Sequence, residues 1–271
     1  MFLERLCISL LLCTATAASA ETISREDIVA QKGCVDCDLV LANLRELEIE
    51  NADFTDALLR EADLKGASLK GGKFVDGDLQ RTEAEKSDFT GADFTDAKMR
   101  SIDLEKSVLT GAIFHDADLR DSDLSECEMS GVDLSESDLR GALVRRSVLT
   151  GASLHDAMAR SADFERIDAA NADLSDGDFK RADFDRANLS GANLDGADLT
   201  GVRLTSANLS GANFGDARLD DALMRRTNLV GADLSGVRGL TRDQLSLACG
   251  DERTRLPRGY SIAKCPAVMM E

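Results

Sequence analysis

The sequence predicts an all-β solenoid, in which the chain turns a corner every five residues. Residues 190–214 show the pattern clearly, because a large apolar residue recurs at every fifth position: Leu194, Leu199, Leu204, Leu209 and Phe214. This spacing fits neither the helical period of 3.6 nor the strand period of two. The register continues without a slip from residue 39 to residue 234. Of its 40 centre positions, 32 are Leu or Phe and none is charged.

Residues 1–20 are predicted to be an export signal that is removed after Ala20. Glu4 and Arg5 precede an apolar run over residues 6–13, and Ala18, Ser19 and Ala20 fit a cleavage site. The run is too short to span a bilayer. We therefore expect an exported protein, periplasmic or secreted, with no stable membrane anchor after cleavage.

Residues 21–36 are predicted to form an N-terminal cap over the first open end of the repeat. The sequence from Ser24 to Asp27, followed by Ile28, indicates an N-capped helical turn. Residues 237–271 are predicted to form the C-terminal cap, because Thr241 and Gln244 have the spacing of a capping box on a short helix. Residues 37–236 then form the solenoid between the two caps.

Five cysteines remain after signal cleavage, and four of them lie at the ends of the repeat. Export permits disulfides, so Cys34, Cys37, Cys249 and Cys265 are disulfide candidates, with one bridge at each end as the economical pairing. A redox CxxC needs a thioredoxin-like setting that is absent here. Cys127 occupies a small-residue position of the repeat, where we expect a buried, unpaired thiol.

The repeated motif Ala-Asp/Asn-Leu/Phe-Ser/Thr-Gly resembles that of the pentapeptide-repeat family, over about 200 of the 271 residues. The resemblance implies a right-handed quadrilateral β-helix with twenty residues in each coil, hence about ten coils with short helical caps. The tail from Cys249 to Cys265 resembles the cysteine-containing tail of some exported members of the family. Family members that protect DNA gyrase from quinolones resemble this chain in fold and acidity.

A coil of twenty residues should leave a pattern of period twenty, and the charged residues show one. Phe54, Phe74, Phe94 and Phe114 recur every twenty residues, which predicts a stack of rings along one inner wall. Arginines and lysines follow the same period on other walls. An acidic file has the same spacing: Asp56, Asp76, Asp96, Asp116, Glu136, Asp156 and Asp176.

The wall that carries this file is the candidate binding site, and we call it the acidic wall. Its outward positions hold 14 acids and one base, Lys73, so it carries about −13 of the formal net charge of −18. This charge disfavours nucleic acid as a partner and favours a basic protein. We also keep two alternatives: a DNA-mimicking binder of the gyrase-protecting type, and weak divalent-cation binding along the wall.

No catalytic residue, cofactor or dedicated metal site is predicted. The two histidines, His115 and His155, lie on the acidic wall two coils apart, which is about 9.6 Å and too far to share an ion. A His115–Asp116 or His155–Asp156 site is conceivable, but the sequence favours solvated histidines. The sequence thus predicts a non-enzymatic, exported scaffold or protein-interaction module; its partner and oligomeric state stay open.

Overall fold

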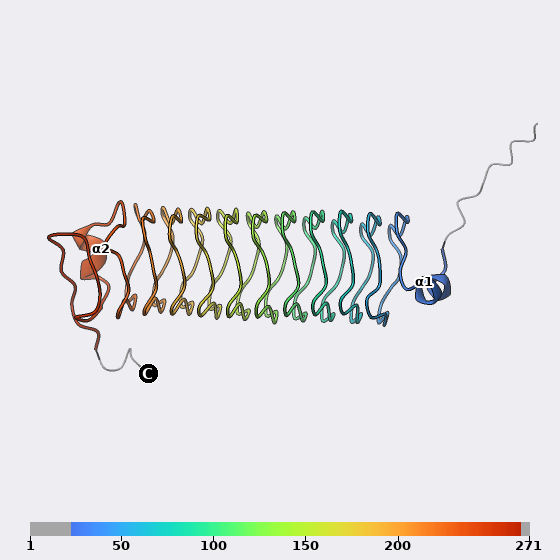
Figure 1. Ribbon diagram of the computed structural model, residues 1–271, viewed down its shortest axis with the longest axis horizontal. Coiled ribbons are helices and arrows are strands. Elements are labelled where there is room, and N and C mark those ends of the chain that lie inside the picture. The colour runs from blue at the N-terminus through green and yellow to red at the C-terminus, as the bar shows by residue number, and fades with distance from the viewer. Residues whose placement is uncertain (1–22, 267–271) are drawn as a thin grey trace, which may run out of the picture.

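The computed structural model describes residues 23–266, which form a straight rod with a short helix near each end (Figure 1). The two helices are α1 (Arg25–Gln31) and α2 (Arg242–Ser246). Everything between them is a stack of similar coils. The predicted export signal, residues 1–20, lies outside the described residues. Within residues 23–266, no helix is long and apolar enough to cross a bilayer.

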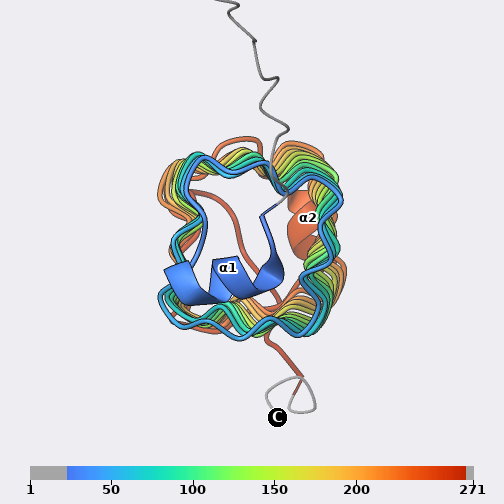
Figure 2. The same ribbon diagram turned by 90° about the vertical axis from the view of Figure 1, so that its right-hand side faces the viewer.

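The coils are four-sided and repeat every twenty residues (Figure 2). Parallel bridges join each paired residue to the residue twenty positions later, from Gly33 with Asp53 to Arg218 with Arg238. Each bridge joins a single residue on one side of a coil to a single residue on the same side of the next coil, because the chain turns a corner every five residues. At one such corner, the Ala57 amide donates to the Phe54 carbonyl over 3.1 Å. The twenty-residue register predicted from the charges is therefore the register of the backbone.

The core is a narrow column made of two side chains from every pentapeptide. The large centre residues and the small residues two places before them point inward and are buried along the rod. The predicted stack is present: ring centroids are 5.3 Å apart for Phe54 and Phe74, and 4.8 Å apart for Phe94 and Phe114. A second group contains Phe164, Phe179 and Phe184.

Both helices begin with the predicted capping boxes and bind the open backbone of the nearest coil. Ser24 and Asp27 exchange hydrogen bonds at α1, as Thr241 and Gln244 do at α2. Arg25 donates to the carbonyls of Arg45 and Glu46 over 2.6 and 3.0 Å. At the other end, Gln244 Nε2 donates to the carbonyls of Leu219 and Ala222 over 2.7 and 3.1 Å. Backbone groups that have no next coil to pair with are thereby partly satisfied.

Candidate functional site

The seven acids of the file occupy the same corner of successive coils. All seven side chains are exposed, and all seven residues adopt the left-handed backbone conformation, with φ between 55° and 58°. Each amide donates to a carbonyl of the next coil, over distances from 2.8 Å at Asp176 to 3.2 Å at Asp116. The backbone of the file is therefore a regular row of corners one coil apart, about 4.8 Å, from which the carboxylates project into solvent.

The backbone does not require an acid at this corner. Asp is tolerated in the left-handed region better than most residues, which offers a purely structural reason for the file. However, the equivalent corner of another wall holds Lys86, Lys106, Arg146 and Arg166 in the same conformation, and a third wall holds glycines there. The left-handed backbone conformation alone therefore does not explain why this corner carries acids.

Other acids on the same wall have a structural role. Asp53 accepts from the Thr55 amide and hydroxyl over 3.1 and 2.7 Å, and Asp93 and Thr95 repeat the arrangement. The hydrogen bonds from the Thr55 hydroxyl and amide lower the pKa of Asp53. These acids brace a corner, so the exposed acidic surface is chiefly the file. The spacing Asp-x-Ser/Thr is the sequence signal that could have separated the two sets.

Charges on the other walls are largely paired. Arg145 lies 2.5 Å from Asp163, Arg160 lies 2.5 Å from Asp178, and Lys180 Nζ lies 2.6 Å from Asp198 Oδ2. By contrast, Asp56, Asp76, Asp96 and Glu136 make no ion pair within the described residues. The acidic wall therefore carries negative charge that ion pairs do not neutralise.

The two histidines lie beside carboxylates of this file. His155 Nε2 is 3.2 Å from Asp156 Oδ2, and its Nδ1 is 3.9 Å from Asp176 Oδ2 in the next coil. Likewise, His115 Nε2 is 3.6 Å from Asp116 Oδ2. Each imidazole is part-exposed, with 44% of the His155 side chain and 38% of the His115 side chain accessible. The histidines, for which solvent exposure was expected, are thus part-exposed and also contact carboxylates of the file.

A Ser–His–Asp contact set exists here, but its hydrogen bonds do not suit a nucleophile. His155 Nδ1 is 3.0 Å from Ser175 Oγ, and Asp156 lies at the other ring nitrogen. The Ser175 hydroxyl donates its proton to Asp173 over 2.7 Å, so it does not donate to the imidazole. A histidine base activates serine only when it accepts that proton. The arrangement therefore does not favour nucleophilic chemistry.

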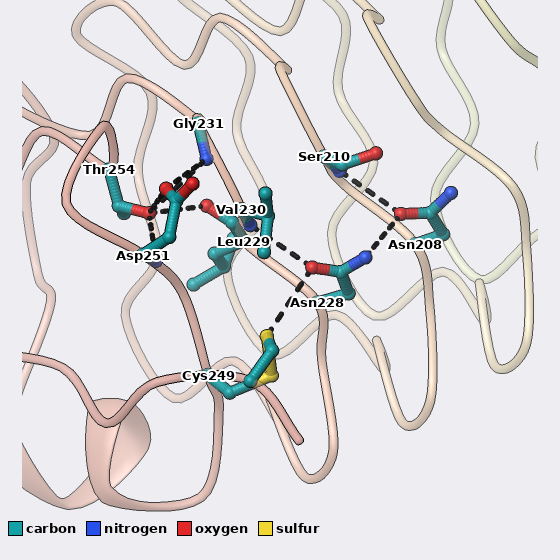
Figure 3. The surroundings of a disulfide bond; sticks show 10 residues. Asn208, Ser210, Asn228, Leu229, Val230, Gly231, Cys249, Asp251 and Thr254 are labelled. Carbon is teal, nitrogen blue, oxygen red and sulfur yellow. Dashed lines mark hydrogen bonds between the residues drawn. A yellow bond between two sulfur atoms is a disulfide. The ribbon is translucent and has the colours of Figure 1, made fainter. Parts of the chain in front are cut away.

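The cysteines form a bridge at each end of the rod. The structure joins Cys34 to Cys37 and Cys249 to Cys265. Figure 3 shows that the second bridge lies at the end of a ladder of asparagine side chains, in which Asn228 Nδ2 donates to Asn208 Oδ1 over 2.9 Å. Cys127 is the free cysteine of the described residues, and it is buried.

No cleft was predicted from the sequence, and the structure shows a shallow one on another wall. It is lined by residues of both charges around Leu143, among them Glu105, Arg145 and Glu165. In the sequence, the only apolar indication of this cleft is Leu143, which occupies an outward position of the repeat. The charged groups of the cleft pair with one another, as in the 3.3 Å contact of Arg166 Nε with Glu165 Oε1. This cleft therefore offers a weaker binding surface than the acidic wall.

Comparison with known proteins places the fold in a family. A model of pentapeptide repeats matches eight copies, in residues 37–83, 87–125, 127–166, 162–201 and 203–238. None of the curated proteins matches the chain.

The similar solved structures include two pentapeptide repeat proteins and one fluoroquinolone resistance protein. HetL, a pentapeptide repeat protein involved in heterocyst differentiation regulation from the cyanobacterium Nostoc sp. strain PCC 7120, is 29% identical; the match covers 73% of this chain and 87% of HetL, with a TM-score of 0.35. Trypsin-treated QnrB1, a plasmid-mediated fluoroquinolone resistance protein, is 20% identical over 68% of this chain and 89% of its own, with a TM-score of 0.41. A thylakoid-lumen pentapeptide repeat protein from Arabidopsis thaliana is 31% identical; the match covers 45% of this chain and 79% of that protein, with a TM-score of 0.28. The chain belongs to the pentapeptide repeat family, whose fold is a right-handed, four-sided β-helix.

Proposed function

We propose that this protein is a non-enzymatic, exported scaffold that binds a basic protein through the acidic wall. One observation carries the proposal. The file from Asp56 to Asp176 is exposed and largely without ion pairs, whereas the charges of the other walls are mostly paired. A surface that served only solubility would have no reason to gather its unpaired charge on one face.

The rod supports recognition by geometry as well as charge. Successive carboxylates lie about 4.8 Å apart, well within the Debye length of about 8 Å at physiological ionic strength. They repel one another because they carry the same charge, and the backbone keeps them at this spacing. A cationic partner relieves that repulsion. Neighbouring strands of a partner sheet are also 4.7–4.9 Å apart, so a sheet face with Lys or Arg on successive strands matches the file.

The finer architecture is part of the same proposal. The scaffold consists of residues 37–236 as about ten coils, roughly 48 Å long at the usual strand spacing. Residues 21–36 and 237–271 act as caps. Cys249 and Cys265 form a bridge within the second cap, and Cys34 of the first cap is bridged to Cys37 at the start of the solenoid. Disulfides at both ends suit an oxidising compartment. This agrees with export directed by residues 1–20 and removal of that segment.

The test is a binding experiment with two variants of equal charge. Asp76→Lys with Asp96→Lys reverses two neighbouring carboxylates of the file, and within the described residues neither side chain contacts a histidine. The matched control is Glu46→Lys with Asp221→Lys, because both residues are exposed, have left-handed backbone conformations and make no ion pair among residues 23–266. Each pair changes the net charge by +4, and therefore alters long-range attraction equally.

We expect a periplasmic extract to yield a partner that binds the wild type and the control but not the file variant. Binding should weaken as salt is raised through 0.5 M, because exposed charges are screened. Equal loss in both variants, or equal retention, would contradict recognition by the acidic wall. Competition of the captured protein by duplex DNA would identify the wall as a DNA mimic, the alternative raised by the sequence.

A further inference from the structure

We propose that the acidic wall contains two binding sites for a transition-metal ion of the zinc class. The principal site consists of His155, Asp156 and Asp176, and the second of His115, Asp116 and Glu136. In each set, one ligand atom from every residue lies within 4.8 Å of the others. The inference goes beyond the protein partner proposed above. The two proposals share the file, but Asp76 and Asp96, the pair varied there, supply no ligand to either metal site.

The distances at the principal site suit a small, four-coordinate ion. Zinc lies about 2.0–2.1 Å from nitrogen and oxygen ligands, so two ligands of a tetrahedron are about 3.3 Å apart. His155 Nε2 and Asp156 Oδ2 are 3.2 Å apart, which already matches that edge. Asp176 Oδ2 lies 3.9 Å from the other ring nitrogen, Nδ1, so its side chain, which is 59% exposed, has to change rotamer to become a third ligand beside Nε2. A fourth position stays open to water or to a donor from another molecule.

The surrounding hydrogen bonds place the free lone pair of His155 on the correct nitrogen. The Ser175 hydroxyl donates to Asp173 over 2.7 Å, so its oxygen is available as an acceptor. Ser175 Oγ lies 3.0 Å from His155 Nδ1 and accepts the Nδ1 proton. Nε2, beside Asp156, then bears the lone pair. Metal-bound histidines are commonly oriented in this way, through a hydrogen bond from the other ring nitrogen.

The backbone holds the ligands in register. His155 and Asp156 form one corner of a coil, and Asp176 lies at the same corner of the next coil. The Asp156 amide donates to the Ser175 carbonyl over 3.0 Å, which connects the two corners directly. Gly196 follows in the third coil, and a Cβ there would lie 2.2 Å from Asp176 Oδ1. The break in the acidic file at Gly196 therefore leaves room for the Asp176 carboxylate.

The second site repeats this arrangement two coils earlier with looser geometry. His115 Nδ1 is 3.0 Å from Ser135 Oγ, as His155 is from Ser175. Its Nε2 is 3.6 Å from Asp116 Oδ2, and the third ligand is the longer side chain of Glu136. Ser135 has only its amide bound to Asp133, over 2.9 Å. We therefore expect this site to bind more weakly than the His155 site.

The imidazole distinguishes these sites from the rest of the file. Carboxylates alone favour hard ions such as Mg²⁺ and Ca²⁺, which take oxygen ligands. An imidazole nitrogen combined with carboxylates suits Zn²⁺, Ni²⁺ or Cu²⁺. Asp56 and Asp76 have no histidine in their own coil or in an adjacent coil, and they provide the internal comparison.

The test is a titration of the purified protein with ZnCl₂ by isothermal calorimetry, in millimolar MgCl₂ to occupy non-selective carboxylates. The wild type should bind two ions, the first more tightly. His155→Asn should remove the tighter event and His115→Asn the weaker one, while Asp76→Asn should keep both. Ser175→Ala should weaken the first event by about 10-fold or more, because an outer-shell partner is lost.

A second measurement reports on the histidines directly. Zinc should shift the imidazole proton resonances of His155 before those of His115, at unchanged circular dichroism. Two-ion binding that survives in the His115→Asn, His155→Asn double variant would overturn the proposal. So would the absence of saturable zinc binding by the wild type in the presence of MgCl₂. Neither outcome bears on binding of a protein partner at Asp76 and Asp96.

Discussion

The ring of Phe74 stacks on the ring of Phe94, with centroids 4.8 Å apart and planes inclined by 11°. Phe94 also stacks on Phe114 and meets Phe89 edge-on at 5.4 Å. It is completely buried, and so is Phe214, for which no ring contact is found within the described residues. The two phenylalanines therefore differ in aromatic contacts rather than in burial.

The stack predicts unequal costs for the same substitution at these two positions. Phe94→Leu should lower the free energy of unfolding by at least about 1 kcal/mol more than Phe214→Leu, since each aromatic pair is worth about 0.5–1.5 kcal/mol beyond burial. Urea denaturation followed by circular dichroism measures the difference. Equal costs would show that burial alone stabilises the column.

Cys127 occupies a buried position that is serine in the coils on either side of it. The Ser107 and Ser147 hydroxyls donate to the carbonyls of Ala84 and Leu124, and Cys127 Sγ lies 2.9 Å from the Leu104 carbonyl in the same way. Because serine already fits this position in neighbouring coils, Cys127→Ser should change the free energy of unfolding by less than about 1 kcal/mol. A larger loss would show that the thiol packs in a way that the hydroxyl cannot.

The same thiol predicts a difference in stability at alkaline pH. Burial raises the pKa of Cys127 to about 12, from an ordinary value of 9.0. The unfolded chain therefore loses this proton above pH 9 while the folded chain keeps it, so stability falls between about pH 9 and pH 12. The loss should reach about 1 kcal/mol at pH 10. The Cys127→Ser variant, compared from pH 7.5 to 10, should lack it; identical pH profiles would contradict a buried thiol.

The bridge from Cys249 to Cys265 closes a segment of sequence separation 16 that extends beyond the last complete coil. A loop of this size stabilises by about 3 kcal/mol in the chain-entropy description. Cys249→Ser with Cys265→Ser should thus expose Arg253, Arg255 and Arg258 to trypsin while the coils remain resistant. The matched control, Cys34→Ser with Cys37→Ser, removes a bridge of separation 3 and should leave this segment protected. Cleavage in both variants would show that the segment is open without regard to its own bridge.

The sequence predicted the register and core well, because both follow from a period that forty repeats make unambiguous. It separated acids that brace corners from free acids less well, since that depends on short contacts such as Asp53 with Thr55. The contact of His155 with Asp176 joins residues 21 apart, so it follows from the twenty-residue coil. The sequence places the two histidines two coils apart, and a contact of either one with the adjacent coil was not predicted. Neither the proton on His155 nor the charge-lined cleft around Leu143 can be derived from periodicity alone.

Gln244 provides a final prediction about the ends of the rod. Its side chain is largely buried and donates to two carbonyls of the last coil, those of Leu219 and Ala222. Removing it leaves the Ala222 carbonyl without a partner among the described residues, whereas the Leu219 carbonyl still accepts from the Ala222 amide. It also weakens the α2 capping box, and an open parallel edge is a template for pairing with another chain. Gln244→Ala should therefore self-associate at micromolar concentration in analytical ultracentrifugation. Ser246→Ala is the matched control, because its hydroxyl binds only the carbonyl of Asp243 within the same helix. Both variants sedimenting like the wild type would show that α2 does not act as the cap.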